Sequence, residues 1–292
     1  MAAKQSYLIL GGSGMLGTDL RAELPDREVT APSSADLDIR DAAAVLEAAA
    51  GADVVINAAA YTRVDDAEEH EPEAHAINAI GAENAARAAA AAGARFVQLS
   101  TDYVFDGVAI EPYREDQPLN PAGAYGRTKA EGEERVLAAH PSPYIVRTAW
   151  LYGAGGRNFP RTMLRLAAER DTVSVVTDQV GQPTWTADLA QQIATLLEVG
   201  ADPGIYHGTN GGSTTWFGFA RAVFERAGLD PERVLPTDSA SLALPAPRPA
   251  YSVLGHTAWT RAALDTPRDW ELALDDAFAA GVFDTELEAL RA

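Results

Sequence analysis

A short apolar run near the N-terminus leads directly into a glycine-rich turn. Residues 7–10 are typical of a buried strand, and glycines follow at positions 11, 14 and 17 in the pattern G-x-x-G-x-x-G. Residues 16–24 then have the apolar spacing of a helix. This order is typical of a dinucleotide-binding turn, in which bare backbone and a helix N-terminus approach a pyrophosphate. We therefore expect residues 11–17 to form a dinucleotide-binding turn.

Segments typical of strands and helices continue to alternate through the first half of the chain. The expected strands are residues 28–31, 53–57, 95–99 and 144–147. The expected helices are residues 41–50, residues 74–92 with Gly93 as C-terminal cap, and the segment carrying Tyr125. Such alternation predicts an α/β fold with a Rossmann-like, doubly wound parallel sheet and a functional site at the strand carboxyl ends. We assign residues 1–150 to this dinucleotide-binding domain.

The second half of the chain has a different character. Expected helices are residues 159–169, 188–199 and 214–227, and expected strands are residues 173–177 and 204–207. From residue 228 the sequence is rich in loops and ends in an acidic helix. We therefore predict that residues 151–292 form a smaller, α-rich substrate-binding lobe, from which one or two segments return to the first sheet.

Composition excludes several classes of function. The net charge of −19 and the pI of about 4.6 argue against nucleic-acid partners and against anionic membrane surfaces. The absence of cysteine excludes disulfides, thiolate nucleophiles and cysteine zinc sites. His70 and His75 are five residues apart, a poor spacing for a shared metal on a helix, so we expect them at the surface. The run at 7–10 is too short for a signal peptide or a membrane span, which predicts a cytoplasmic protein.

One of only two lysines lies four residues after a tyrosine. The chain has 21 arginines, yet Lys129 follows Tyr125 at the i, i+4 spacing that places both side chains on one helix face. An ammonium beside a phenol favours the phenolate, which lowers the pKa of the tyrosine and suits it to proton transfer near neutral pH. The alternative is a surface pair on a solvated helix.

Other distinctive residues also come directly after expected strands. Small residues at 58–60 follow one strand and leave room for a flat ring system, although they also suit simple helix packing. Ser100 and Thr101 follow the next strand, and Trp150 follows another. Because parallel strands end at one edge of the sheet, these features and the glycine turn are expected to lie together.

Taken together, the glycine turn, Ser100-Thr101 and the Tyr125–Lys129 pair resemble the extended short-chain dehydrogenase/reductases. The stretch at 100–107, which reads STDYVFDG, is similar to the signature of the dTDP-4-dehydrorhamnose reductase family. Further similarity to that family is found at residues 57–65, 147–153, 178–184 and 248–254. The resemblance covers at least residues 7–254.

This resemblance implies NADPH- or NADH-dependent reduction of the 4-keto group of dTDP-4-dehydro-6-deoxy-L-mannose to dTDP-L-rhamnose. Tyr125 would give its proton to the developing alkoxide, Lys129 would lower the Tyr125 pKa, and Thr101 would donate to the substrate oxygen. The cofactor contacts it implies are Gly11, Gly14, Met15, Leu16, Gly17, Asp38, Ile39, Ala59, Ala60, Tyr61, Tyr125 and Lys129. The substrate contacts it implies are Thr101, Asp102, Val104, Phe105, Trp150 and Arg248. A homodimer is an expectation from the family alone.

Three points of the resemblance stay open. Trp150 is equally suited to the core, and Arg248 could pair with the diphosphate or be an ordinary surface arginine. Residues 30–34 carry neither an acid for the ribose nor an arginine for a 2′-phosphate, so NADH and NADPH both remain possible. The position where some family members place a metal-binding glutamate is Ala187, so no metal site is predicted.

Two rival functions remain. A related nucleotide-sugar 4-epimerase or another 4-ketoreductase would use the same three catalytic residues. A non-catalytic regulatory subunit on the same fold is the alternative from another class. Retention of Thr101, Tyr125 and Lys129 argues against it, because a scaffold needs no phenol of low pKa.

Overall fold

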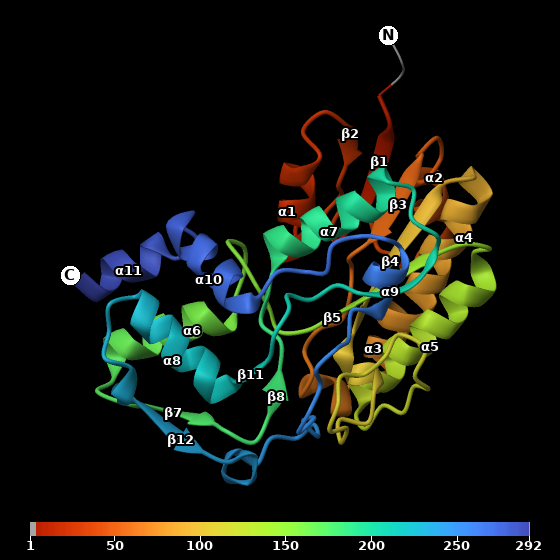
Figure 1. Cartoon of the computed structure of the whole chain (residues 1–292). Helices are drawn as coiled ribbons and strands as arrows, with labels where there is room; N and C mark the ends of the chain where they lie inside the picture. Colours follow the sequence, from red (N-terminus) through yellow and green to blue (C-terminus); the bar gives the residue numbers. More distant parts are fainter. Residues whose placement is uncertain (1–3, 292) are drawn as a thin grey trace.

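The computed structural model describes residues 4–291, which form a larger and a smaller lobe (Figure 1). The larger lobe contains a six-stranded sheet in the order β10-β5-β4-β3-β1-β2, and every neighbouring pair is parallel. Its strands are β1 (Ser6–Leu10), β2 (Glu28–Thr30), β3 (Val54–Asn57), β4 (Arg95–Thr101), β5 (Tyr144–Thr148) and β10 (Gly204–His207). Strand order reverses between β1 and β3, beside the glycine turn. This confirms the predicted doubly wound α/β class.

Helices cover both faces of the sheet because successive residues of its strands point to opposite faces and both faces are apolar. One face, with Tyr7 and Ile9, packs against α1 (Met15–Glu23) and α7 (Thr186–Glu198). The opposite face, with Leu8 and Leu10, packs against α2 (Ala42–Ala48), α4 (Ala82–Ala92) and α5 (Ala124–Ala139). A strand buried on both faces needs apolar residues at nearly every position, as the sequence has here.

The helix expected at residues 74–92 is interrupted. It runs as α3 (Glu71–His75), a π-helical segment η2 (Ala76–Gly81) and α4, and it ends at Gly93 with φ +68° as predicted. A Cβ on Gly132 of α5 would lie 2.2 Å from the carbonyl oxygen of Asn78, so the π segment and α5 meet at backbone distance. The widened turn carries Asn78 into the protein interior, and such π turns are frequent at functional sites.

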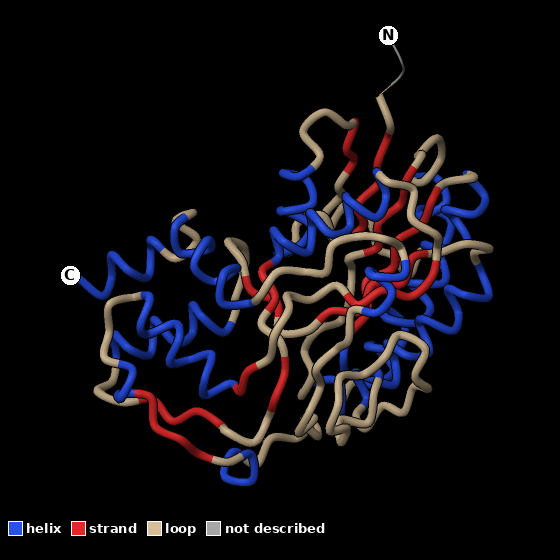
Figure 2. Tube along the Cα trace, viewed as in Figure 1, coloured by secondary structure: helices blue, strands red, loops and turns tan. Residues whose placement is uncertain are grey.

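The smaller lobe is mostly helical. Its elements are α6 (Phe159–Glu169), α8 (Trp216–Arg226), α10 (Trp270–Ala279) and α11 (Asp284–Arg291), with the parallel pair β7 (Val173–Val176) and β12 (Val234–Thr237). Loops and two short strand pairs connect the lobes (Figure 2): β6 (Leu151–Tyr152) with β9 (Thr184–Trp185), and β8 (Val180–Gly181) with β11 (Thr214–Thr215). The remaining helices are η1 (Asp66–Glu68), η3 (Asp102–Val104), η4 (Pro231–Arg233), η5 (Ser239–Leu242) and α9 (Thr257–Arg261).

Three elements after residue 151 lie in the larger lobe. Strand β10 extends the sheet, α7 packs on α1, and α9 packs on β10. The strand expected at residues 204–207 is β10, so a later segment does return to the first sheet. A domain division at residue 150 stays a prediction. The expected helix 214–227 begins two residues later, after β11. Within residues 4–291, no helix has the length and apolar character needed to span a membrane.

A buried ion pair joins α5 to two strands of the sheet. Arg147 of β5 is 1% exposed and Glu133 of α5 is 2% exposed, with Arg147 Nη2 2.7 Å from Glu133 Oε2. The Ser100 hydroxyl at the end of β4 donates to Glu133 Oε1. Arg147 also donates to the carbonyl oxygen of Glu115 at 3.1 Å and lies over the Phe105 ring. The pair therefore holds α5, β4 and β5 in register.

Replacement of Arg147 by methionine is expected to lower the free energy of unfolding by about 3–5 kcal/mol, since it leaves Glu133 as an uncompensated buried charge. The matched control is Arg165→Met, because Arg165 pairs with Glu169 on the exposed face of α6. The control should cost only about 0.3–0.5 kcal/mol. Urea unfolding measures both values, and similar losses in the two variants would contradict a structural role for the buried pair.

Candidate active site

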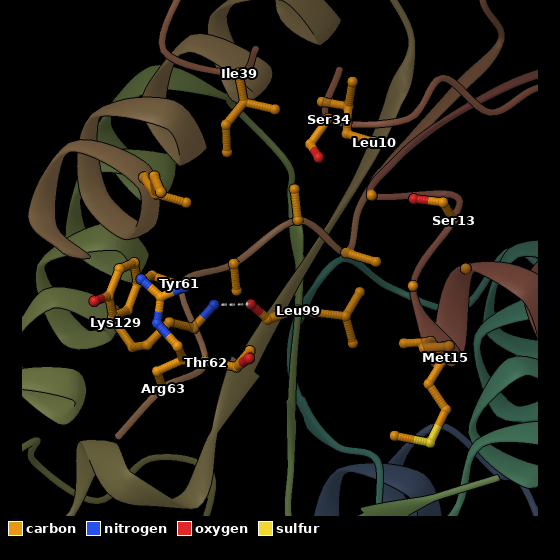
Figure 3. A pocket seen from close by; sticks show the side chains of 18 of the residues that line it. Leu10, Ser13, Met15, Ser34, Ile39, Tyr61, Thr62, Arg63, Leu99 and Lys129 are labelled. Carbon is orange, nitrogen blue, oxygen red and sulfur yellow. Dashed lines mark hydrogen bonds between the residues drawn. The ribbon is translucent and has the colours of Figure 1, made fainter. Parts of the chain in front are cut away.

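One pocket of about 710 Å³ lies at the carboxyl edge of the sheet, beside the point where strand order reverses. It is formed by the turn after β1, the ends of β3 and β4, and α5 (Figure 3). Its volume lies within the range usual for small-molecule and cofactor sites. All twelve of the cofactor contacts expected from the sequence line it: Gly11, Gly14, Met15, Leu16, Gly17, Asp38, Ile39, Ala59, Ala60, Tyr61, Tyr125 and Lys129.

The glycine turn forms a cradle that side chains would fill. Gly11 has φ +77°, and a Cβ there would lie 2.7 Å from the Ala59 nitrogen. A Cβ on Gly17 would lie 2.4 Å from the Gly11 carbonyl oxygen. Helix α1 begins at Met15, and within the described chain no side chain caps its N-terminus. Exposed backbone N–H groups and the positive end of the helix dipole fit a pyrophosphate at this point.

The opposite end of the pocket is shaped by Asp38 and Ile39 (Figure 3 labels Ile39). The Ile39 side chain packs over Gly81, where a Cβ would lie 2.5 Å from Ile39 Cδ1. Arg40 donates to both carboxylate oxygens of Asp38 and holds the Asp38 pKa below its ordinary value. Arg40 also lines the pocket, although it lies well past residues 30–34, the segment after β2 where the sequence is expected to carry a phosphate-binding arginine.

Asn78 is a second residue that sequence analysis missed. It is 2% exposed, its Oδ1 accepts from the Tyr61 N–H at 2.8 Å, and its Nδ2 donates to the Tyr61 carbonyl and to Thr128 Oγ1. These hydrogen bonds hold Tyr61, in the pocket wall after β3, close to Thr128 of α5. No local pattern around Asn78 distinguishes it, because only the π turn brings it to that position.

Tyr125 and Lys129 both face the pocket from α5. Lys129 Nζ donates to the Leu99 carbonyl oxygen at 2.6 Å (dashed line in Figure 3), and burial lowers the pKa of Lys129 to about 8. Burial raises the pKa of Tyr125 to about 12, while a hydrogen bond with the Thr101 side chain acts in the lowering direction. The sequence predicts that Lys129 lowers the pKa of Tyr125. In the structure this pKa is raised instead, because desolvation of the phenol is the largest effect on it.

The expected substrate contacts fall into two groups. Thr101 and Asp102 end β4 and begin η3, next to Tyr125. None of the six expected substrate contacts is among the residues that line the pocket. Val104 and Phe105 are almost completely buried. They are buried in a cluster with Tyr113 and Leu254, and the Phe105 ring stacks on that of Tyr113 with centroids 4.3 Å apart. The turn after Asp102 directs both side chains inward, so they pack in the core here, and a substrate contact by either residue stays a prediction.

Trp150 lies at the junction of the two lobes. Its φ is +47°, unusual for a residue with a Cβ, and its ring stacks on that of Trp216 with centroids 3.6 Å apart. A Cβ on Gly181 would lie 2.5 Å from the Trp150 ring, so this strand must carry glycine for the indole to lie flat. Backbone strain of this kind persists only where the surrounding structure holds the residue in place, and it is frequent at active sites. Trp216 carried no signal in the sequence.

Arg248 is engaged by a carboxylate. Its Nη2 donates to Asp65 Oδ2 at 2.7 Å, and the Ala246 N–H donates to the other oxygen of Asp65 at 3.2 Å. The proline-rich segment that carries Arg248 therefore crosses from the smaller lobe to the chain that follows Tyr61. A contact of Arg248 with the diphosphate stays a prediction. It would require Arg248 to leave Asp65 and bind the diphosphate in its place.

The two close histidines have separate partners: His75 Nε2 lies 3.0 Å from Glu131 Oε1, and His70 lies beside Asp66. Among residues 4–291 there is no group of three or more His, Asp or Glu side chains arranged to hold a metal ion. Ala187 lies in the first turn of α7, and the neighbouring Asp188 carboxylate is paired with Arg268.

Comparison with known proteins agrees with this architecture. The family model for the RmlD substrate binding domain matches residues 5–282. A dTDP-4-dehydrorhamnose reductase of Streptomyces griseus is 51% identical over 94% of this chain and 93% of its own length. A probable dTDP-4,6-dihydroxy-2-methyloxan-3-one 4-ketoreductase of Streptomyces antibioticus is 47% identical over 93% of this chain and 94% of its own.

Among solved structures, the dTDP-4-dehydrorhamnose reductase of Bacillus anthracis in complex with NADP superposes with a TM-score of 0.91. It is 38% identical to this chain, with 95% of this chain and 100% of that one covered. The chain therefore belongs to the family of the RmlD substrate binding domain, the dTDP-4-dehydrorhamnose reductases that its motifs resemble.

Proposed function

We propose that this protein reduces the 4-keto group of dTDP-4-dehydro-6-deoxy-L-mannose to give dTDP-L-rhamnose, with NADPH or NADH as reductant. The observation that carries the proposal is the convergence of the glycine cradle, Tyr125 and Lys129 in one pocket. The relatives named for this reaction cover nearly the whole chain, and the Bacillus anthracis structure holds NADP.

The reduced nicotinamide, when bound, supplies the hydride that reaches C4 of the sugar. The turn at Gly11–Gly17 and the N-terminus of α1 hold the pyrophosphate. Tyr125 gives its proton to the developing alkoxide, and burial keeps that phenol protonated until the alkoxide forms. Lys129 stays oriented by the Leu99 carbonyl, and its nearby positive charge stabilises the phenolate that results.

A second candidate is a 4-ketoreductase for another dTDP-linked keto sugar. The Streptomyces antibioticus relative, named for such a reaction, is 47% identical. A 4-epimerase would show no net cofactor turnover, because it returns the hydride. A regulatory subunit would bind without oxidising the cofactor.

Cofactor oxidation tests the proposal. With enzymatically generated dTDP-4-dehydro-6-deoxy-L-mannose, absorbance of NADPH or NADH should fall and dTDP-L-rhamnose should form, while UDP- and GDP-linked keto sugars run in parallel react poorly. Oxidation with a different dTDP keto sugar would favour the second candidate. Cofactor binding without oxidation by any keto sugar would remove the reductase assignment.

Replacement of Tyr125 by phenylalanine should lower kcat by roughly 10²–10⁴-fold, because it removes the proton donor. Tyr144→Phe is the matched control, since that buried phenol donates to the Ala201 carbonyl oxygen away from the pocket. Steady-state assays compare the two variants with the unmodified chain. Equal activity of Tyr125→Phe and the unmodified chain would show that Tyr125 has no catalytic role.

Replacement of Lys129 by arginine should lower turnover roughly 10²-fold although the charge is kept, because a planar guanidinium cannot occupy the position of Nζ beside Leu99. Lys4→Arg changes the only other lysine, which is exposed, and should have no effect. Near-normal turnover of the first variant would mean that charge alone is needed at this position.

Gly17→Ala should abolish detectable NADPH binding, because the added Cβ would meet the Gly11 carbonyl oxygen at 2.4 Å and close the cradle. The control is Gly51→Ala, which strains a left-handed turn after α2, where a Cβ meets nothing within 4 Å. The control should lose stability but keep affinity for NADPH. Fluorescence titration with NADPH separates the two effects, and unchanged binding by Gly17→Ala would argue against the cradle.

A further inference from the structure

Asp102 is a buried carboxyl group that the mechanism above does not use. It is 3% exposed and begins η3, directly after Thr101. The Thr101 hydroxyl donates to Asp102 Oδ1 at 2.9 Å. Asp102 Oδ2 and the Ser252 hydroxyl both lack a hydrogen-bond partner among residues 4–291. A buried carboxyl group next to the reacting centre, with one oxygen unpaired, requires a physical explanation.

The hydrogen bonds of the Thr101 side chain limit what its single proton can do. A hydroxyl has one proton to donate and two positions at which to accept. Thr101 Oγ1 already accepts from the Tyr103 N–H at 3.2 Å and gives its proton to Asp102. The Thr101 side chain also acts on the pKa of Tyr125 in the lowering direction, so its hydroxyl lies close enough to serve the phenol as a donor if its proton is released. One proton cannot serve Asp102 and the reacting centre at the same time.

The protonation state of Asp102 decides between these two uses. An ionised carboxylate only accepts hydrogen bonds, so it takes the Thr101 proton. A carboxylic acid can donate from Oδ1 to Thr101 Oγ1, which fills the second acceptor position of that oxygen. The Thr101 proton is then free to turn toward Tyr125 and the substrate oxygen.

We propose that Asp102 is a positioning residue that must be in its acid form for catalysis, because only the acid form releases the Thr101 hydroxyl as a donor to the reacting oxygen. This inference rests on the proposed reductase function. It gives the buried carboxyl a role in proton placement, in place of the direct substrate contact expected from the sequence.

The surroundings of Asp102 favour the acid form. Burial raises the pKa of Asp102 to about 6, while the nearby Ser252 and Thr101 hydroxyls act in the lowering direction. The titratable groups around it are Tyr103 on η3 and Tyr125 on α5, and the Asp102 charge raises the pKa of both. The charge of Arg248 lowers the pKa of Tyr103, and the charge of Asp65 raises it. Lys129, further along α5, titrates near pH 8.

The first test is the pH profile of kcat/KM for Asp102→Asn, measured as NADPH oxidation with the dTDP-linked keto sugar. In the unmodified chain, kcat/KM should fall about tenfold per pH unit above the Asp102 pKa, before Lys129 titrates. An asparagine amide donates to Thr101 Oγ1 at every pH, so the variant should lose this fall between pH 6 and 7.5. Asp106→Asn, which neutralises a nearby aspartate bonded to Tyr113, should keep the unmodified profile.

Two outcomes would overturn the proposal. One is a folded Asp102→Asn variant whose profile still falls in parallel with the unmodified chain, which would assign the titration to another group. The other is a folded variant inactive at every pH, which would mean that the ionised carboxylate is needed. Absence of activity in the unmodified chain would instead remove the proposed function, so the two failures are distinct.

A second variant keeps the test decisive if Asp102→Asn does not fold. Ser252→Ala removes a hydroxyl that lowers the Asp102 pKa, and it leaves Thr101 and Asp102 in place. The fall in kcat/KM should therefore move to higher pH. An unmoved profile would contradict control by Asp102.

The stability of the fold supplies a readout independent of activity. Because the folded-state pKa of Asp102 is raised, protonation stabilises the fold, and this contribution is lost as pH rises from about 4 to about 6. The melting temperature of the unmodified chain should therefore fall relative to Asp102→Asn over this range. Parallel melting curves would show that Asp102 does not titrate in the buried site.

Discussion

The contact of α5 with the carboxyl end of β4 supports the rest of the site. Glu133 binds Arg147 and accepts from Ser100, and one turn earlier Lys129 donates to the Leu99 carbonyl oxygen. These bonds are buried, so each is costly to leave unmade. They fix the rotation of α5 and thereby the position of Tyr125, which directly precedes Gly126, the glycine at which the helix approaches the Tyr103 backbone. A helix held only by apolar packing could rotate or slide, and the phenol would move with it.

Burial has opposite consequences for neighbouring groups of this site. It raises the pKa of Tyr125 and of Asp102 and lowers that of Lys129, because a low-dielectric environment always disfavours the charged form. A phenol that remains protonated until an alkoxide develops is suited to reduction of a ketone. Desolvation of the phenol therefore sets the direction of the Tyr125 pKa shift, in place of the charge of Lys129 that the spacing suggested.

The smaller lobe meets the sheet through strained or competing contacts. Trp150 has a left-handed backbone and stacks on Trp216 from α8, while Arg248 is paired with Asp65. Both aromatic partners come from segments far apart in the sequence. The positions of these side chains depend on β8 and β11 as much as on the residues themselves. The sequence therefore left two interpretations open for Trp150 and for Arg248, and it indicated no role for Trp216.

Much of this protein was determined by local sequence. Apolar runs on both strand faces require a covered parallel sheet, a glycine turn between strand and helix requires a close backbone approach, and an i, i+4 spacing requires one helix face for Tyr125 and Lys129. Tertiary structure alone decided the rest. Asn78 is carried into the interior behind Tyr61 by a π turn, Val104 and Phe105 turn into the core, and Asp102 acquires its raised pKa from burial. Periodicity and spacing specify which face a residue occupies, whereas desolvation and long-range hydrogen bonds depend on what packs against that face.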